Sequence, residues 1–149
     1  MRILMLTRYD RKGASSRVRS LQYVPFLKKK GWQVKVRPLF SDAYLEALYG
    51  KGGRGKIVLL GYLRRLLDLA RAKAYDLIWL EKELFPYLPA YAEYFLKVLG
   101  FPYVVDYDDA LFHRYDNHRW WVVRTVLGRK IDMVMRHATL VIAGNEYLA

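Results

Sequence analysis

The sequence contains no cysteine, and its 14 acidic residues are outnumbered by 26 lysines and arginines. Without cysteine the chain has no disulfide bonds and no thiolate metal or redox site. No apolar run approaches the roughly 18 to 20 residues that a helix needs to span a bilayer. The first residues also lack the longer apolar stretch and small-residue cleavage site of a signal peptide. We therefore expect a cytoplasmic protein that does not cross a membrane.

The remaining composition suits one globular domain of 149 residues, 54% of them hydrophobic and 27% charged. Its positive charge is concentrated in the first half. Residues 1–73 carry a net charge of +14 and residues 74–149 a net charge of −2, which together give +12. A basic half attracts nucleic acid, anionic lipid headgroups or phosphorylated substrates, and composition does not choose among these. A solvated basic surface without a partner is the alternative.

Short apolar runs alternate with helical patterns along the whole chain. The strand-like runs are residues 2–7, 33–37, 76–81, 103–107 and 139–143. The helical patterns are residues 15–30, 56–73, 86–99 and 118–137. Short continuous apolar runs are typical of strands buried on both faces. The alternation predicts an α/β domain with a Rossmann-like, doubly wound parallel sheet.

Local signals predict where several of these elements begin and end. Ser15 or Ser16 is expected to cap the first helix. Pro25 is expected to kink that helix, because proline lacks an amide donor. Pro38 is expected to end the second strand for the same reason. Asn145 is a good N-cap for a further helix near the end of the sequence.

The helix predicted at residues 56–73 follows a glycine-rich connector at residues 50–55. These glycines match the spacing G-x-G-x-x-G, but they do not follow the first strand, so we interpret them as a linker. The stretch 51–73 contains seven basic residues and one acid. Arginines lie on one side of the helix and leucines around the rest. We expect the leucines to pack against the sheet, with contact to an anionic membrane as the alternative.

In an open parallel sheet, ligands bind at the carboxyl ends of the strands, beside the point where the strand order reverses. For a strand order of 3-2-1-4-5, this point lies between the first and fourth strands. It therefore involves the loops at residues 8–17 and 106–113. The first loop is cationic and the second is acidic.

The first loop has the composition of a phosphate site. Gly13, Ser15 and Ser16 stand at a helix start, where free amides and the positive end of the helix attract anions. Arg8 and Arg17 flank them with guanidinium groups. A capped helix with solvated arginines is the alternative interpretation.

The second loop places Asp106, Asp108 and Asp109 within four residues at a strand end. Carboxylates so close together repel one another. They can accept hydrogen bonds from sugar hydroxyls, ligate a metal as a D-x-D motif, or raise one another's pKa for base chemistry. One of them capping the following turn is the structural alternative. His113, at the end of this loop, has no distinctive partner in the sequence.

Five motifs, taken in order, resemble the N-terminal domain of family 4 retaining glycosyltransferases. They are residues 1–6, 13–19, 75–83, 106–112 and 138–148. The resemblance covers the whole chain and implies a GT-B enzyme built from two Rossmann-like domains. This domain would bind the acceptor. A second domain, absent from residues 1–149, would bind most of the nucleoside-diphosphate sugar, so this chain alone is expected to lack activity.

The predicted site follows from the two loops and the resemblance. Its members are Asp108 and Asp109 as catalytic residues, Gly13, Ser15 and Ser16 at the donor phosphates, and Arg8, Arg17, Asp106 and His113 at the acceptor. The resemblance implies that the sugar keeps its anomeric configuration through phosphate contacts, with no metal and no cofactor besides the nucleotide-sugar donor. The expected acceptor is a glycan or a lipid-linked glycan, with possible peripheral contact to the inner face of an anionic membrane.

Two other functions compete with this one. A metal-dependent transferase or phosphatase would use Asp106 and Asp108 as D-x-D ligands. A basic nucleic-acid-binding module ranks last, because the sequence has no zinc, RNA-recognition or helix-turn-helix motif. We therefore expect no nucleic-acid partner.

Overall fold

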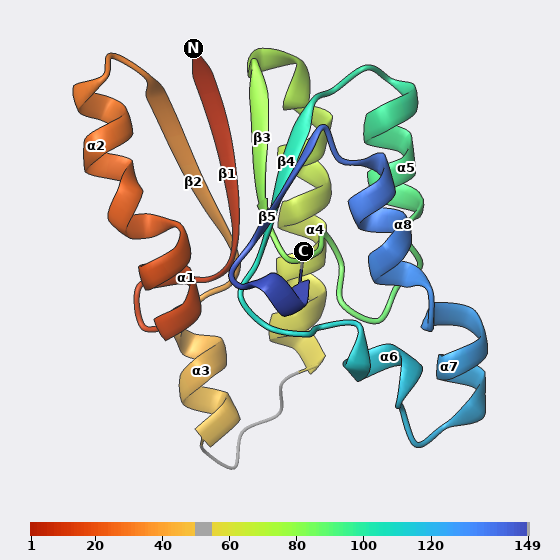
Figure 1. Ribbon diagram of the computed structural model, residues 1–149. Helices are drawn as coiled ribbons and strands as arrows, with labels where there is room; N and C mark the ends of the chain where they lie inside the picture. The colour runs from red at the N-terminus through yellow and green to blue at the C-terminus, as the bar shows by residue number, and fades with distance from the viewer. Residues whose placement is uncertain (50–54, 149) are drawn as a thin grey trace.

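A computed structural model describes residues 1–49 and 55–148 and contains one sheet of five parallel strands (Figure 1). The strands are β1 (Arg2–Tyr9), β2 (Gln33–Phe40), β3 (Leu77–Glu81), β4 (Tyr103–Tyr107) and β5 (Leu140–Ala143). The predicted α/β, doubly wound fold is confirmed. Of the predicted linker, only Gly55 lies within the described residues.

The strand order is β2-β1-β3-β4-β5, so the predicted order 3-2-1-4-5 is wrong. β3 pairs with β1 on one side and with β4 on the other. Burial explains this position, because Ile78, Leu80 and Glu81 of β3 are almost inaccessible to solvent. β2 instead carries the polar residues Lys35 and Arg37 and lies at the edge of the sheet. The order therefore reverses between β1 and β3, and the loop after β3 joins the ligand-binding edge.

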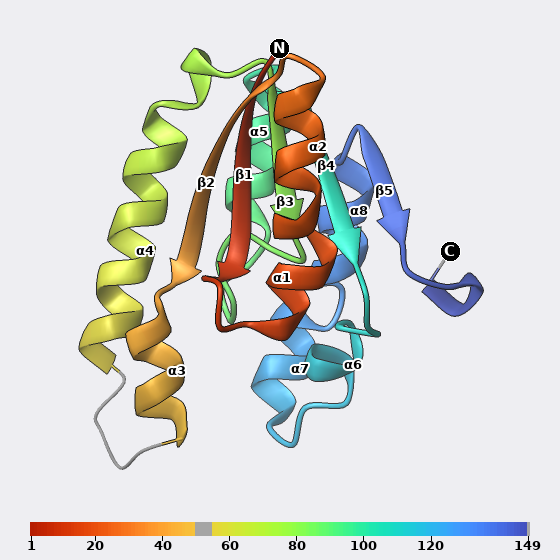
Figure 2. The same ribbon diagram turned by 90° about the vertical axis from the view of Figure 1, so that its left-hand side faces the viewer.

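Helices cover both faces of the sheet. They are α1 (Ala14–Arg19), α2 (Val24–Lys29), α3 (Asp42–Tyr49), α4 (Gly55–Ala70), α5 (Tyr91–Val98), α6 (His113–Asp116), α7 (Trp121–Leu127) and α8 (Lys130–His137), with the 3-10 turns η1 (Leu21–Tyr23), η2 (Ala72–Ala74) and η3 (Glu146–Leu148). Figure 2 looks onto the face that carries α1 and α2, with α4 along one side of the molecule and α5 and α8 behind the sheet. Alternation along β1 divides the core: Ile3 and Met5 pack with Leu27 of α2, whereas Leu4 and Leu6 join the larger cluster beneath α5 and α8.

The first predicted helix is interrupted, as expected. α1 ends at Arg19, and α2 begins after η1 with Pro25 in its first turn, where the missing amide costs no hydrogen bond. The predicted serine cap is wrong. Gly13 is the N-cap of α1, and the hydroxyls of Ser15 and Ser16 donate to carboxylates instead.

Three other predicted boundaries also change. Pro38 does not end β2, which continues to Phe40 because an edge strand pairs on one side only and tolerates proline. Residues 86–90 are not helical, and Tyr87 has a left-handed φ of 58° that no α-helix contains. The helix predicted at 118–137 is divided into α7 and α8 at Arg129, whose ψ of 14° leaves the helical range.

The last predicted helix is one 3-10 turn, η3. The side chain of Asn145 caps it, with Oδ1 accepting a hydrogen bond from the amide of Leu148 at 3.1 Å. Within the described residues, no helix combines the length and apolar character required to cross a bilayer.

The orientation of α4 reverses the sequence expectation. The leucines that were expected to pack against the sheet are exposed by about half or more: Leu59, Leu60, Leu63, Leu66 and Leu67. Gly61 and Arg65 are buried instead, and Nη2 of Arg65 donates to the carbonyl oxygen of Thr7 at 2.7 Å. Burial lowers the pKa of Arg65 to about 10. Gly61 allows the close approach, because a Cβ there would lie 2.5 Å from the carbonyl oxygen of Leu39 in β2.

This contact predicts different effects for two glycine substitutions in the same helix. Gly61→Ala should lower the free energy of unfolding by about 1 to 3 kcal/mol, because the added methyl forces α4 away from β2. Gly55→Ala is the matched control, since its Cβ would meet no atom within 4 Å. Urea unfolding of both variants measures the difference. Equal stability would contradict the close packing of α4 at Gly61.

Candidate functional site

The two predicted loops meet at the carboxyl edge of the sheet. Oγ of Ser15 lies 2.6 Å from Oδ2 of Asp108, although 93 positions separate them in the sequence. β3 stands between the strands that lead into these loops, and Glu81 at its end bonds the same hydroxyl at 3.1 Å. The predicted proximity is therefore confirmed, but the end of β3 forms part of the site.

Glu81 holds the cationic loop in place. Its carboxylate is 2% exposed and accepts hydrogen bonds from the amide of Arg8 at 3.0 Å and from Oγ of Ser16 at 2.7 Å. Oγ of Ser16 in turn accepts from the amide of Tyr9 at 2.9 Å. A negative charge directly behind the serine hydroxyls opposes phosphate binding by these hydroxyls. Ser16 is fully buried, so Ser15 is the serine of this loop that a ligand can reach.

Gly13 has a steric role in the same loop. It is buried, and a Cβ at this position would lie 2.3 Å from Cβ of Tyr9. Any side chain would therefore push the end of β1 away from the start of α1.

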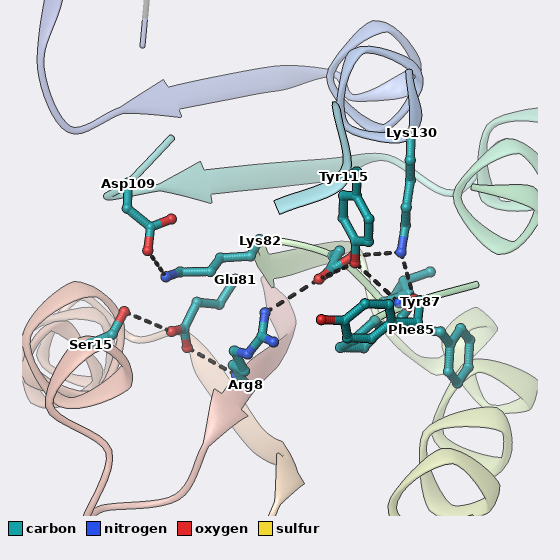
Figure 3. A network of polar contacts seen from close by, with 12 residues as sticks. Arg8, Ser15, Glu81, Lys82, Phe85, Tyr87, Asp109, Tyr115 and Lys130 are labelled. Carbon is teal, nitrogen blue, oxygen red and sulfur yellow. Dashed lines mark hydrogen bonds and ion pairs between the residues drawn. The ribbon is translucent and has the colours of Figure 1, made fainter. Parts of the chain in front are cut away.

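Lys82 connects β3 to the acidic loop. Its φ of 69° lies in the left-handed region, which is uncommon for residues other than glycine. Figure 3 shows its side chain extended toward Asp109. Nζ lies 2.8 Å from Oδ1 of Asp108 and 2.9 Å from Oδ2 of Asp109. Lys82 thus neutralises part of the charge that the clustered aspartates bring together.

The same contacts set the ionisation of this pair. Burial alone would lower the pKa of Lys82, but the two carboxylates outweigh it and the pKa is raised. Burial would raise the pKa of Asp108, but hydrogen bonds from Lys82 and Ser15 outweigh it and the pKa is lowered. Asp108 is therefore ionised at neutral pH. It is suited to accept hydrogen bonds and poorly suited to remove a proton.

Asp106 lies apart from the other two aspartates. It is 3% exposed and forms an ion pair with Arg19 of α1. Burial raises its pKa, and the arginine offsets only part of this increase. Both residues line a cavity of about 240 Å³ with Tyr23 and Trp79. Within the described residues Arg17 does not pair with this aspartate: it is exposed, and its guanidinium donates to the carbonyl oxygen of Arg11 at 3.4 Å.

Arg8 belongs to a buried cluster behind the site. Its Nη1 lies 3.3 Å from Oε1 of Glu83, and the same carboxylate accepts a 2.7 Å hydrogen bond from the hydroxyl of Tyr115. Lys130 also forms an ion pair with Glu83 and donates to the carbonyl oxygen of Phe85 at 2.6 Å. Figure 3 shows Arg8, Tyr115 and Lys130 converging on this point. One buried carboxylate therefore pairs with two cations.

His113 lies at the start of α6 and is exposed. Its Nε2 is 3.0 Å from the hydroxyl of Tyr147, and its Nδ1 is 3.3 Å from Asp116. These contacts join α6 to η3. Within residues 1–49 and 55–148, the ring of His113 forms no hydrogen bond with the three aspartates of the acidic loop.

Four charged residues of this region have no role predicted from the sequence: Arg19, Glu81, Lys82 and Glu83. Three of them follow one another at the end of a buried apolar strand, which is itself a signal of a ligand-binding edge. The incorrect strand order left these three residues out of the predicted site, because it placed β3 away from the point where the strand order reverses. Arg19 had no signal in the sequence beyond its proximity to Arg17.

The aspartates do not form a metal site of the usual kind. In the part of the chain that the structure describes, no three His, Asp or Glu side chains are grouped so that they could hold a metal ion. Asp106 and Asp108 each face a different cation, Arg19 and Lys82. The arrangement is an edge of hydrogen-bond acceptors with one accessible hydroxyl and one ammonium group.

Comparisons with protein-family models, with curated proteins and with solved structures gave no match to this chain. The function is therefore inferred from the geometry of this edge and from the motifs of the sequence.

The buried cluster predicts a large effect from a single substitution. Lys130→Met should lower the free energy of unfolding by about 1 to 3 kcal/mol, because the buried carboxylate of Glu83 and the carbonyl oxygen of Phe85 each lose a charged hydrogen-bond donor. Arg129→Met is the matched control, because the neighbouring arginine side chain is 88% exposed. Its effect should stay within about 0.5 kcal/mol. Similar losses in both variants, measured by urea unfolding, would count against the cluster.

The ion pair of Lys82 predicts a change in the titration of Asp108. The lowered pKa of this aspartate stabilises the fold above its unfolded pKa of about 3.9, and this stabilisation is lost as the pH falls through the folded pKa. In Lys82→Met, the hydrogen bond and charge of the ammonium group no longer oppose the effect of burial, so the pKa of Asp108 should rise. Carboxyl NMR titration measures it, with Asp76, whose pKa is lowered by Arg2, as an internal reference that should not move. An unchanged pKa of Asp108 would disprove the coupling.

Proposed function

We propose that this chain is the acceptor-binding domain of a retaining glycosyltransferase of the GT-B type. A second domain would hold most of the nucleoside-diphosphate sugar, and the sugar would pass to a glycan or lipid-linked acceptor at the carboxyl edge. The observation that supports this most strongly is the group formed by Ser15, Lys82, Asp108 and Asp109. The same proposal assigns the protein to the cytoplasm.

The two accessible aspartates are suited to bind sugar hydroxyls. The side chains of Asp108 and Asp109 are 25% and 57% exposed, so each keeps lone pairs that can face a ligand. A hydrogen bond from a hydroxyl to a charged group contributes about 1.5 to 3 kcal/mol. Polyhydroxylated ligands offer several such donors at spacings that neighbouring carboxylates can accept.

The ionisation of Asp108 determines its role in the proposed reaction. A carboxylate with a lowered pKa is a weak base, so this residue would orient the acceptor hydroxyl and leave the proton to another group. That agrees with the mechanism implied by the family resemblance, in which donor phosphate contacts replace a protein base. Asp109, the more exposed of the two, would share the same function.

The cationic loop has a smaller role in this proposal than its composition suggests. Gly13 and Ser16 hold the loop, while the hydroxyl of Ser15 is the group of this loop that can reach donor or acceptor. The buried ammonium group of Lys82 would position Asp108 and Asp109. Arg8 and Asp106 would support the site from buried ion pairs. Of the group that supports the proposal, Ser15, Asp108 and Asp109 would therefore contact the ligand directly.

The proposal predicts weak glycan binding that depends on the aspartates. Saturation-transfer NMR of the chain with a panel of glycosides should detect binding. Asp108→Asn and Asp109→Asn should each weaken it about ten- to hundredfold. Arg17→Ala is the control, because this arginine is exposed and its guanidinium donates to the carbonyl oxygen of Arg11. Melting curves of each variant exclude unfolding.

Three results would overturn the proposal. They are the absence of glycoside binding by the wild-type chain, wild-type affinity in both aspartate variants, and Mn²⁺ binding that is lost in Asp108→Asn. The last result would instead favour the D-x-D metal enzyme. A calorimetric titration with Mn²⁺ provides that comparison.

A further inference from the structure

The outward side of α4 is a continuous leucine surface. It consists of Leu59, Leu60, Leu63, Leu66 and Leu67, which are 49 to 61% exposed. At about 100° per residue these positions occupy one side of the helix, opposite the buried Gly61 and Arg65. Isolated exposed leucines are normal on protein surfaces, but five on one side of one helix indicate a surface that something else covers.

Basic side chains border this leucine surface. Lys56 precedes it, and Arg64 and Arg71 lie along one flank, all three exposed. Asp68 is the one acidic residue between positions 55 and 73, and its carboxylate forms an ion pair with Arg37 of β2 at 3.1 Å. The side chain of Asp68 is only 15% exposed. The outward side of α4 therefore combines apolar and positive groups without an exposed acid.

From this combination we infer that α4 docks on the surface of a bilayer that contains anionic lipids. Its leucines would enter the boundary between headgroups and acyl chains. Arg64 and Arg71 would extend their apolar stems along the helix and keep their charges at the phosphates. The inference rests on α4 itself and not on the proposed glycosyl transfer.

The position of α4 favours a bilayer over a protein partner. Figure 2 shows α4 as the outermost element on one side of the molecule. Lipids can yield around a helix in this position, whereas a protein partner would need a matching groove. α5 also exposes apolar residues, but Lys97 is its one exposed charged residue within the described chain. Charge complementarity to an anionic surface therefore favours α4 over α5.

Docking through α4 would bring the candidate site close to the lipid. In Figure 2 the helix runs alongside β2, and the strand arrows point toward its N-terminal end at Gly55. The carboxyl edge with Ser15 and Asp108 lies at that same end of the sheet. A membrane-bound molecule would thus present this edge beside the bilayer surface.

Vesicle flotation tests the inference with the full chain. We expect binding to vesicles of phosphatidylcholine mixed with phosphatidylglycerol, little binding to pure phosphatidylcholine, and weaker binding as salt rises. Leu63→Ser combined with Leu67→Ser should reduce binding more than tenfold. Each of Arg64→Gln and Arg71→Gln should reduce it about fivefold.

A matched control lies on the opposite face of the sheet. Val18 of α1 and Phe26 of α2 are 55% and 58% exposed, and Val18→Ser combined with Phe26→Ser should leave vesicle binding unchanged. Circular dichroism melting shows whether each variant is folded.

The inference fails if the leucine variant floats as well as the wild type, or if the control variant loses binding equally. Equal binding to neutral and anionic vesicles would remove the role of the arginines. Light scattering tests whether the chain forms a dimer through α4. A dimer that separates in the leucine variant, together with no vesicle binding, would identify a protein interface and overturn the inference.

Discussion

The candidate site depends on three consecutive residues at the end of β3: Glu81, Lys82 and Glu83. The carboxylate of Glu81 fastens the end of β1 and the start of α1 through the amide of Arg8 and the hydroxyls of two serines. The next residue, Lys82, extends to the acidic loop, and Glu83 turns inward to the buried cations. The β1, β3 and β4 ends are thus held together by one short segment. Without it the cationic and acidic loops would have no common partner.

This arrangement requires a backbone conformation that has an energetic cost. A residue other than glycine in the left-handed region is disfavoured by roughly 1 to 2 kcal/mol. Lys82 adopts this conformation, and the turn directs its side chain and that of Glu83 to different sides. Ion pairs at both side chains offset the cost. Because the side chain of Lys82 is buried, its ion pairs are less screened by solvent than surface pairs are.

The sequence predicted the elements of this fold much better than their arrangement. Apolar runs and proline or glycine signals are local, and they located all five strands and the break before α2. Strand order depends on pairing between distant segments, so β3 was misplaced and Lys82 was overlooked. The predicted orientation of α4 was wrong for a different reason. Leucines on one side and arginines on another predict an amphipathic helix, but they do not show which side faces the sheet when a glycine such as Gly61 permits close approach.

In the folded chain, part of the positive charge of the basic half is paired internally. Several cations of the basic half are used internally, where Arg8 pairs with Glu83, Arg19 with Asp106 and Arg65 with a carbonyl oxygen of β1. Two of these pairs join the basic half to the acidic half, so they contribute to the fold and not to an external field. The arginines along α4 are exposed and accompany leucines. This combination of apolar and positive groups suits a lipid surface, whereas binding to a phosphate backbone relies mainly on charge.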